Sequence, residues 1–280
     1  MNGLLRSLRR IVFALAIGVS LILAVVAAVV RQPSIRSLAY PKGPRSSADI
    51  LRRHVEFFTA TVRPRGADQP ENLDRAAAYI GERFREAGAR VSEQAFIDRG
   101  RTYRNVIADF GPLAGDKLIV GAHYDAFTST GDLPGADDNA SGTAGLLELA
   151  RLLGICAPRR PVELVAFTTE EPPFFGSEKM GSAVHAAQLQ RSHRGVAGMI
   201  CLEMIGYFRG EQTWQSPLLG MMYPSKGDFI AVTGGWPDRE LGRDVKAAIR
   251  GAAGIDVYSF TGPREMLDAS DQRNYWSRGW

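Results

Sequence analysis

The stretch "GAHYDAFTSTGDLPGADDNASG", residues 121–142, decides the fold. It places one histidine and four aspartates in a turn-rich segment that directly follows an apolar run. The run "KLIVGAHYD" predicts a buried strand, and "SGTAGLLELARLL", from Ser141 to Leu153, has the apolar spacing of an amphipathic helix. A buried strand, a loop and a helix in this order form the repeating unit of an α/β fold.

Strands and helices alternate along the chain on both sides of this stretch. Helices are predicted from Ser47 onward, over Asn72–Ala87, over "GSEKMGSAVHAAQL" and over Arg239–Ala252. Strands are predicted over "VSEQAFI", "NVIADF", "VELVAFTTEE", "VAGMICLEMIGYF" and "FIAVTGG". This order predicts an α/β domain with a largely parallel sheet over residues 47–280.

An uncharged apolar stretch, residues 11–30, precedes this domain, and its length of about twenty residues suffices for one helix to cross a bilayer. The positive charge is heavier before the stretch, with Arg6, Arg9 and Arg10, which favours a cytoplasmic N-terminus. We therefore expect residues 1–10 in the cytoplasm, a single-pass anchor in the cell membrane, a linker over residues 31–46 and an extracytoplasmic domain. The alternative is a cleaved signal peptide and a secreted domain, although a signal's apolar region is usually only roughly 7–15 residues long.

The composition is that of an ordinary globular protein, with 280 residues, 45% of them hydrophobic and 23% charged. The net charge of +4 comes from scattered arginines without interleaved aromatic residues, so no nucleic-acid partner is expected. Cys156 and Cys201 are too few for a disulfide framework, and their apolar neighbours predict two small buried core residues.

Acidic residues follow three of the predicted strands, at the point where each strand ends. In open α/β sheets, ligands gather outside the carboxyl ends of the strands. One histidine with several carboxylates is the ligand set of a hydrolytic zinc site. The sequence therefore predicts a metal centre at this edge, built from His123, Asp125, Asp137, Asp138, Glu170, Glu171 and Glu203.

The adjacent pair Glu170-Glu171 suits such a centre. Consecutive residues of an extended segment point to opposite sides, so one carboxylate can bind metal while its neighbour moves a proton. Each motif also has a structural alternative: a histidine at a strand end often serves packing, and Ser141 in "DDNASG" could cap a helix. Their common position at successive strand ends favours the metal site.

The segments "HYD", "GADDNASG", "TTEEPPFFGS" and "LEMIGY" resemble the motifs of the M28 family of co-catalytic zinc aminopeptidases and their relatives. The resemblance covers most of residues 47–280. It implies a three-layer α/β/α zinc-exopeptidase-like fold with a mixed, largely parallel sheet. It also implies a cis peptide bond between Asp138 and Asn139.

The same resemblance implies a role for each site residue. His123 and Glu203 would bind a first zinc, Glu171 a second, and Asp138 would bridge the two. Glu170 would be the general base, and Asp125 would orient His123. Glu203 stands where the family usually has aspartate. The implied reaction is metal-assisted removal of N-terminal residues from peptides, with Zn²⁺ as cofactor, two ions expected and one possible.

A fifth ligand of the family, a late histidine for the second zinc, has no counterpart in this chain. His185 and His193 come too early and are expected to be ordinary surface residues, and Gln272 in "SDQRNYW" stands where relatives often have histidine. Two explanations follow: a truncated form of a normal enzyme, which we favour, or a short protein with an incomplete second site.

Two other functions remain compatible with the sequence. One is acyl transfer of the glutaminyl-cyclase kind at a single zinc, and the other is a metal-deficient or non-catalytic peptidase-like domain. Retention of Glu170 beside Glu171 argues against the non-catalytic alternative, because a binding module needs no general base. No motif fixes the substrate side chain or the oligomeric state; Tyr207, Phe208 and Tyr275 are the candidates for a specificity pocket.

Overall fold

The structure is a computed structural model of the whole chain, of which we describe residues 2–33, 38, 43–127, 133–214, 216–252 and 254–280. The chain divides into two compact units. One contains Lys42–Tyr207 and Asp268–Trp280, and the other contains Met1–Pro41 and Phe208–Leu267. The single domain predicted over residues 47–280 stays a prediction, because its residues are shared between these units.

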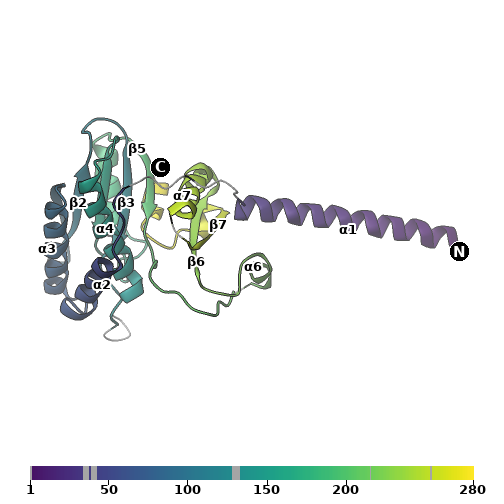
Figure 1. Ribbon diagram of the computed structural model, residues 1–280, viewed down its shortest axis with the longest axis horizontal. Coiled ribbons are helices and arrows are strands. Elements are labelled where there is room, and N and C mark those ends of the chain that lie inside the picture. Colours follow the sequence, from purple (N-terminus) through teal and green to yellow (C-terminus); the bar gives the residue numbers. More distant parts are fainter. Residues whose placement is uncertain (1, 34–37, 39–42, 128–132, 215, 253) are drawn as a thin grey trace. The chain divides into compact units, whose positions relative to one another are not determined.

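The larger unit is built on a five-stranded sheet in the order β1-β2-β4-β3-β5 (Figure 1). Strands β1, β2 and β4 pair antiparallel, whereas β4, β3 and β5 run parallel. The sheet is therefore mixed, and its parallel part carries the predicted metal-binding segments. The strand bounds are Arg90–Asp98 for β1, Arg101–Phe110 for β2, Lys117–His123 for β3, Val162–Phe167 for β4 and Val196–Cys201 for β5.

Helices cover both faces of this sheet, which confirms the predicted three-layer fold. Alternate strand residues point to opposite faces. On one face, residues such as Val106 and Leu164 pack with α2, α3 and α4, and on the other Ile107 and Val165 pack with α5 and α8. The helix bounds are Ala48–Glu56 for α2, Pro70–Glu86 for α3, Gly142–Ile155 for α4, Gly181–Arg191 for α5 and Arg273–Trp276 for α8, with π-helical turns η1 at Phe57–Thr61 and η2 at Ala136–Ser141.

Several predicted elements are shorter than the sequence pattern indicated; the strand predicted over "VELVAFTTEE", for example, ends at Phe167. The helix predicted over "GSEKMGSAVHAAQL" begins only at Gly181, because Gly176 has a φ of 77°, which a right-handed helix excludes. The strand predicted over "VAGMICLEMIGYF" ends at Cys201, and Met204 has a φ of 47°. The late start of α5 leaves Glu178 in a loop, and the early end of β5 leaves Glu203 in one. The helix predicted from Ser47 begins at Ala48, and the Ser47 hydroxyl accepts a hydrogen bond from the backbone N–H of Ile50 at 3.4 Å.

The smaller unit holds a two-stranded parallel sheet of β6 (Phe229–Gly235) and β7 (Asp256–Gly262) with α7 (Arg239–Ala252). Strand β6 and α7 match the sequence prediction, whereas β7 and α6 (Pro217–Met222) were not predicted. Short 3-10 turns, η3 (Trp236–Asp238) and η4 (Arg264–Met266), complete this unit.

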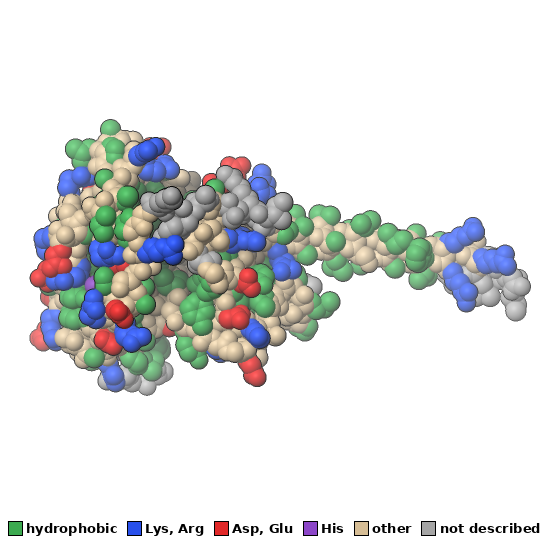
Figure 2. Space-filling model, in the orientation of Figure 1, with side chains coloured by type: hydrophobic (Ala, Val, Ile, Leu, Met, Phe, Trp, Pro, Cys, Tyr) green, Lys and Arg blue, Asp and Glu red, His purple; other side chains and the backbone are tan. Residues whose placement is uncertain are grey.

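The N-terminal helix α1 (Asn2–Arg31) belongs to the smaller unit. Its segment Arg9–Arg31 has a mean hydropathy of 2.9 and none of it is buried, so it is long and apolar enough to cross a membrane. Figure 2 shows hydrophobic side chains along this helix and basic side chains near its N-terminal end. A signal sequence near the N-terminus can meet the same criteria of length and hydropathy, so both alternatives remain compatible with this helix.

Three expectations about single side chains are wrong. His185 is buried rather than on the surface: its Nδ1 lies 2.7 Å from the hydroxyl of Tyr275, and its Nε2 lies 3.3 Å from Glu163. Tyr275 is 1% exposed and therefore does not line a substrate pocket. Cys156 is exposed because it follows directly on the last residue of α4, and Cys201 is only half-buried.

Candidate metal centre

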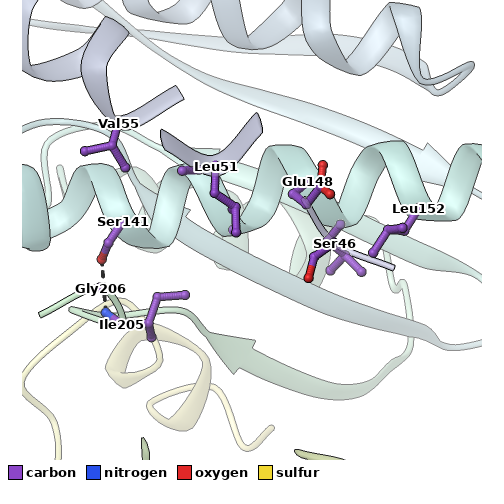
Figure 3. Close-up of a pocket in the computed structure, with 11 residues that line it drawn as sticks. Ser46, Leu51, Val55, Ser141, Glu148, Leu152, Ile205 and Gly206 are labelled. Carbon is purple, nitrogen blue, oxygen red and sulfur yellow. Dashed lines mark hydrogen bonds between the residues drawn. The ribbon is translucent and has the colours of Figure 1, made fainter. Parts of the chain in front are cut away.

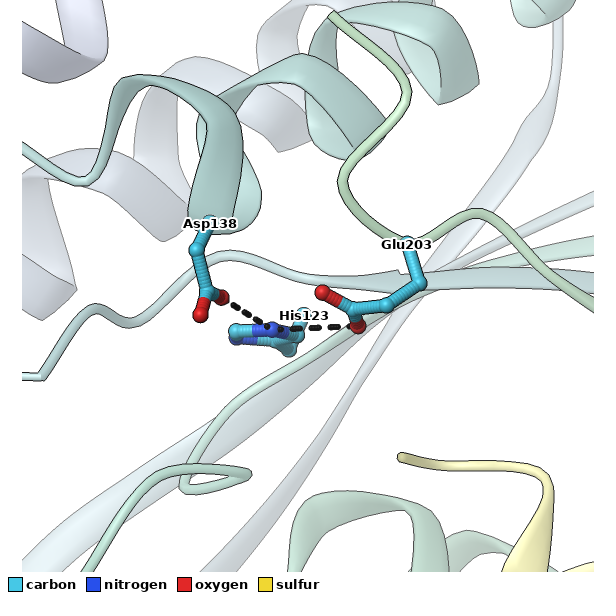
Figure 4. A group of neighbouring side chains, drawn as sticks. All are labelled: His123, Asp138 and Glu203. Atoms are coloured by element: carbon cyan, nitrogen blue, oxygen red, sulfur yellow. Dashed lines mark ion pairs between the residues drawn. The ribbon is translucent and has the colours of Figure 1, made fainter. Parts of the chain in front are cut away.

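Three predicted ligands converge at the carboxyl edge of the parallel strands (Figure 4). The Nε2 atom of His123 lies 3.2 Å from Oδ1 of Asp138 and 3.4 Å from Oε2 of Glu203. One donor atom from each of the three residues lies within 4.8 Å of the other two. This spacing allows a single cation to contact all three side chains.

Strand order brings these residues together. His123 is the last residue of β3, and Glu203 follows two residues after the end of β5, the parallel neighbour of β3. The backbone N–H of Leu202 donates to the carbonyl of Gly121 at 2.8 Å, which carries the pairing up to Glu203. The Thr143 hydroxyl of α4 donates to the carbonyl of His123 at 2.8 Å and fixes the other side of this strand end.

The turn η2 supplies Asp138. The peptide bond between Asp138 and Asn139 is cis, as the resemblance implied. The buried amide of Asn139 donates to the carbonyl of Leu202 at 2.9 Å, so η2 is tied to the segment that carries Glu203. Asp137 is used differently: its Oδ1 accepts from the backbone N–H of Gly206 at 2.8 Å. Asp137 therefore holds the loop after β5, while Asp138 faces His123.

Asp125 connects the ends of β3 and β4. It is wholly buried, and its two oxygens accept hydrogen bonds from the backbone N–H groups of Glu170, at 3.2 Å, and Glu171, at 3.0 Å. Its Oδ1 also lies 3.3 Å from Nδ1 of His123. One carboxylate thus contacts the histidine ring and bonds the backbone of both adjacent glutamates.

Glu170 points toward the cluster, with Oε2 3.9 Å from Nε2 of His123. Glu171 is buried, and its Oε1 has no hydrogen-bond partner among the residues that the structure describes. It is not one of the three residues whose donor atoms converge on one point. The structure therefore brings together His123, Asp138, Glu203 and Glu170, with Glu171 held one residue further along the same loop.

Burial of so many acidic groups raises their proton affinity. Burial raises the pKa of Glu170 to about 9; the charge of His123 opposes this increase and the charges of Asp271 and Asp125 add to it. Burial also raises the pKa of Glu171 to about 7, with a contribution from Asp138. Burial would lower the pKa of His123, but its carboxylate neighbours outweigh burial and raise that pKa well above its usual range. Such shifts are typical of functional sites.

Sequence reasoning missed Asp271, a carboxylate beside the cluster. Asp271 is completely buried, and neither of its oxygens has a hydrogen-bond partner within the described part of the chain. Burial raises its pKa to about 7. The preceding Ser270 donates to Oε2 of Glu203 at 2.7 Å, so this segment contacts a predicted ligand directly. The sequence signal for Asp271 is its place in "SDQRNYW", directly before Gln272.

Asn105 was predicted only as a strand residue. It is completely buried, its Oδ1 accepts from the backbone N–H of Thr168 at 3.2 Å, and its amide donates to the carbonyl of Gly181 at 2.8 Å. It therefore joins the end of β4, just before Glu170, to the first residue of α5. Nothing in the pattern "NVIADF" distinguished this role from that of a half-exposed strand residue.

A pocket of about 290 Å³ lies elsewhere in the same unit, between α2, α4 and the loop after β5 (Figure 3). Most of its lining is apolar, with Leu51, Val55 and Leu152 among the lining residues. None of the predicted ligands lines it. We therefore locate the candidate active site at the acidic cluster rather than at this pocket.

The residues present fit a zinc ion. A histidine nitrogen with carboxylate oxygens is a donor set that zinc accepts. Glu171 and Asp271 have buried carboxylate oxygens with no hydrogen-bond partner among the described residues. Such oxygens are unfavourable unless a cation or protons compensate them. The cluster thus has both the ligand chemistry and the excess negative charge that a divalent cation requires.

The chain has a mixed sheet between two helical layers, and a histidine and carboxylates lie at the ends of its parallel strands. This fold is that of the zinc exopeptidase-like α/β proteins. The chain belongs to peptidase family M28, whose family model matches residues 105–279. This membership supports a metal-dependent, peptidase-like function.

Individual relatives agree with this membership. The chain is 45% identical to the protein YfbL of Escherichia coli (strain K12) over 280 residues, which cover 96% of this chain and 84% of that protein. It is 32% identical to leucine aminopeptidase 1 of Arthroderma otae over 141 residues, 48% of this chain and 36% of that protein. The chain thus spans well under half the length of the fungal aminopeptidase.

Solved structures share the fold. The Legionella pneumophila aminopeptidase LapA aligns with a TM-score of 0.64 at 18% identity, covering 83% of this chain and 58% of LapA. A glutaminyl cyclase from Bacteroides thetaiotaomicron aligns with a TM-score of 0.58 at 18% identity, covering 84% of this chain and 82% of the cyclase. At this identity the likeness concerns the fold alone.

Proposed function

We propose that the chain is a zinc-dependent peptidase that removes N-terminal residues from peptides. The observation that carries this proposal is the convergence of His123, Asp138 and Glu203 beside the buried Glu170. Metal-assisted hydrolysis is supported by this donor set, by Glu170 as an adjacent proton acceptor and by membership of peptidase family M28.

His123, Asp138 and Glu203 would hold one zinc, and Glu171, with Asp138 as a bridge, would hold a second. When bound, zinc polarises a carbonyl oxygen and lowers the pKa of bound water. Asp125 keeps the His123 ring in place through the 3.3 Å contact at Nδ1, which leaves Nε2 for the metal. The Ser270 hydroxyl, which donates to Glu203 at 2.7 Å, orients that carboxylate in the same way.

Glu170 would act as the general base. Its backbone N–H is fixed by Asp125, and its carboxylate lies at the cluster without serving as one of the three converging ligands. It would take a proton from the attacking water and return that proton to the leaving amine of the substrate. In the metal-free site the pKa of about 9 keeps Glu170 protonated near neutral pH. The positive charge of bound zinc would lower that pKa and so free the carboxylate to accept a proton.

Helix α1 would anchor the chain in the cell membrane with the catalytic unit on the extracytoplasmic side. The support is its length and hydropathy together with the arginines that precede it. If the segment is instead a cleaved signal, the same unit would be secreted. Peptides outside the cytoplasm are the expected substrates in either case.

The test measures zinc per chain and aminoacyl-amide hydrolysis on the full chain purified in detergent, for the unmodified protein and for Glu170→Gln. Bound zinc with turnover that is lost in Glu170→Gln is the expected result. Glu178→Gln serves as a matched control, because Glu178 is exposed in the same loop. Zinc without hydrolysis but with cyclisation of N-terminal glutamine would favour the glutaminyl-cyclase-like alternative, and absence of zinc would favour a non-catalytic domain.

A further inference from the structure

Arg65 is an arginine in the core of the larger unit, and the proposed reaction assigns it no part. It is 1% exposed and lies between η1 and α3, outside the residues 105–279 that the family model matches. A buried arginine is uncommon unless every polar atom is satisfied, because burial of an unpaired charge is costly. Its partners therefore indicate what it does.

Among the described residues, the hydrogen-bond acceptors of the Arg65 side chain are all backbone carbonyls. Nε donates to Tyr124 at 2.9 Å, Nη1 donates to Pro134 at 3.0 Å and also to Phe58, and Nη2 donates to Gly135 at 2.9 Å. The backbone of Arg65 adds a further bond, accepting from the N–H of Ala126 at 3.1 Å.

Three of these four side-chain acceptors, Tyr124, Pro134 and Gly135, lie on the two segments that carry His123 and Asp138, two of the proposed first-zinc ligands. Tyr124 directly follows His123, and Gly135 directly precedes η2, which contains Asp138. One guanidinium group thus joins the backbone that leaves β3 to the backbone that enters η2. The 3.2 Å approach of His123 to Asp138 depends on how these two segments are placed.

The packing around Gly135 leaves no room for a side chain at this position. Gly135 has a φ of 55°, and a Cβ added there would lie 2.5 Å from the carbonyl of Asp138 and 2.6 Å from Cβ of Ala126. The same Cβ would lie 2.9 Å from Nη2 of Arg65. The turn therefore closes directly onto the guanidinium group.

Lysine cannot reproduce this arrangement. Arginine presents five N–H donors in a rigid planar fork, whereas lysine carries one compact ammonium at the end of a flexible stem. The four carbonyls lie on three separate segments. The fixed N–H donors of arginine can bond all of them at once, whereas the single ammonium group of lysine cannot. The carboxylates of Asp125 and Asp138 also interact favourably with the charge of Arg65, which offsets part of the cost of its burial.

We infer that Arg65 is a positioning residue for the metal centre, which holds Asp138 at the distance from His123 that zinc binding requires. The inference rests on the proposed function, because it concerns the same centre. Substitution of residues that support metal ligands typically weakens metal affinity by about 10–100-fold. We expect a loss of this size in zinc affinity for Arg65→Lys.

The experiment compares the full chain in detergent with its Arg65→Lys and Gly135→Ala variants. Zinc dissociation constants are measured by competition with a chromogenic chelator, and the visible absorption of the Co²⁺-loaded protein reports ligand geometry. Arg101→Lys is the matched control, because Arg101 makes one bond, at 3.3 Å, to the carbonyl of Ala67 and is largely exposed. Gly135→Ala displaces the same turn while leaving the arginine in place, so it serves if Arg65→Lys does not fold.

Weaker zinc binding and an altered cobalt spectrum in Arg65→Lys or Gly135→Ala, with Arg101→Lys unchanged, would support the positioning role. A lowered melting temperature with unchanged zinc affinity and cobalt spectrum would overturn it and assign Arg65 to fold stability alone. An unmodified chain that binds no zinc would instead overturn the proposed function itself, and with it this inference.

Discussion

Zinc binding to the acidic cluster should release protons, and the number released can be worked out from the site. At pH 7 the metal-free protein holds a proton on His123, whose pKa is well above its usual range, and about half a proton on Glu171, whose pKa is about 7. Both must be deprotonated to bind metal. Filling both zinc positions should therefore release about 1.5 protons at pH 7, and about 2.5 if Glu170 ionises as well.

The sign of the pH dependence follows from these raised pKa values. Each group holds a proton that the metal must displace, so the zinc affinity rises with pH through the range in which the group titrates. Near pH 7 the logarithm of the affinity should rise by about 1.5 to 2.5 for each pH unit, since the slope equals the number of protons released. Above the pKa of Glu170, about 9, the slope should decrease.

Isothermal titration calorimetry of zinc into the chelator-stripped full chain provides the measurement. Titrations in two buffers with different ionisation enthalpies give the proton count directly, and repeating them at pH 7 and pH 9 gives the slope. Glu170→Gln separates the contribution of Glu170 from that of the ligands. A release below about half a proton at pH 7, with no change of affinity between the two pH values, would refute the assignment of His123 and Glu171 as protonated ligands.

Three further predictions concern the framework around the site. Asn105→Leu removes the side chain that bonds two buried backbone groups, so it should lower the free energy of unfolding by about 2–4 kcal/mol in denaturant titrations, and unchanged stability would contradict this. Gly121→Ala would place a methyl group against the ring of Phe167 and should lower the free energy of unfolding by about 1–3 kcal/mol, measured in the same way. An unchanged free energy of unfolding would mean that the sheet can accommodate the methyl group. Tyr275→Phe removes the hydroxyl paired with His185 and should cost about 1 kcal/mol, seen as a lower melting temperature with zinc content unchanged.

The larger part of the α/β framework could be predicted because it depends on local patterns. The apolar run before His123 has the length of a buried strand, and Ser141–Leu153 has helical spacing. Parallel strand ends meet at one edge, so acidic residues placed after separate strands were expected to approach one another. The convergence of His123, Asp138 and Glu203 follows from this topology.

The remaining features depend on contacts between distant parts of the chain. Arg65 bonds backbone carbonyls near residues 124 and 135, and a carbonyl carries no side-chain signal in the sequence. Asp271 reaches the cluster only because the chain returns to the larger unit after residue 267. His185 lies on a helix of mixed polarity, and its burial depends on Tyr275, which is 90 positions away. Such partners are visible only once the fold is known.

The central claim is that His123, Asp138 and Glu203 bind zinc, and zinc K-edge X-ray absorption on the full chain tests it most directly. We expect nitrogen and oxygen ligands at about 2.0–2.2 Å and no sulfur ligand, with the signal lost in His123→Ala. A zinc–zinc distance of about 3.5–4 Å in the same spectrum would indicate that a second ion is bound. A zinc–sulfur distance of about 2.3 Å, or a spectrum unchanged in His123→Ala, would contradict the claim, because the metal would then be bound elsewhere.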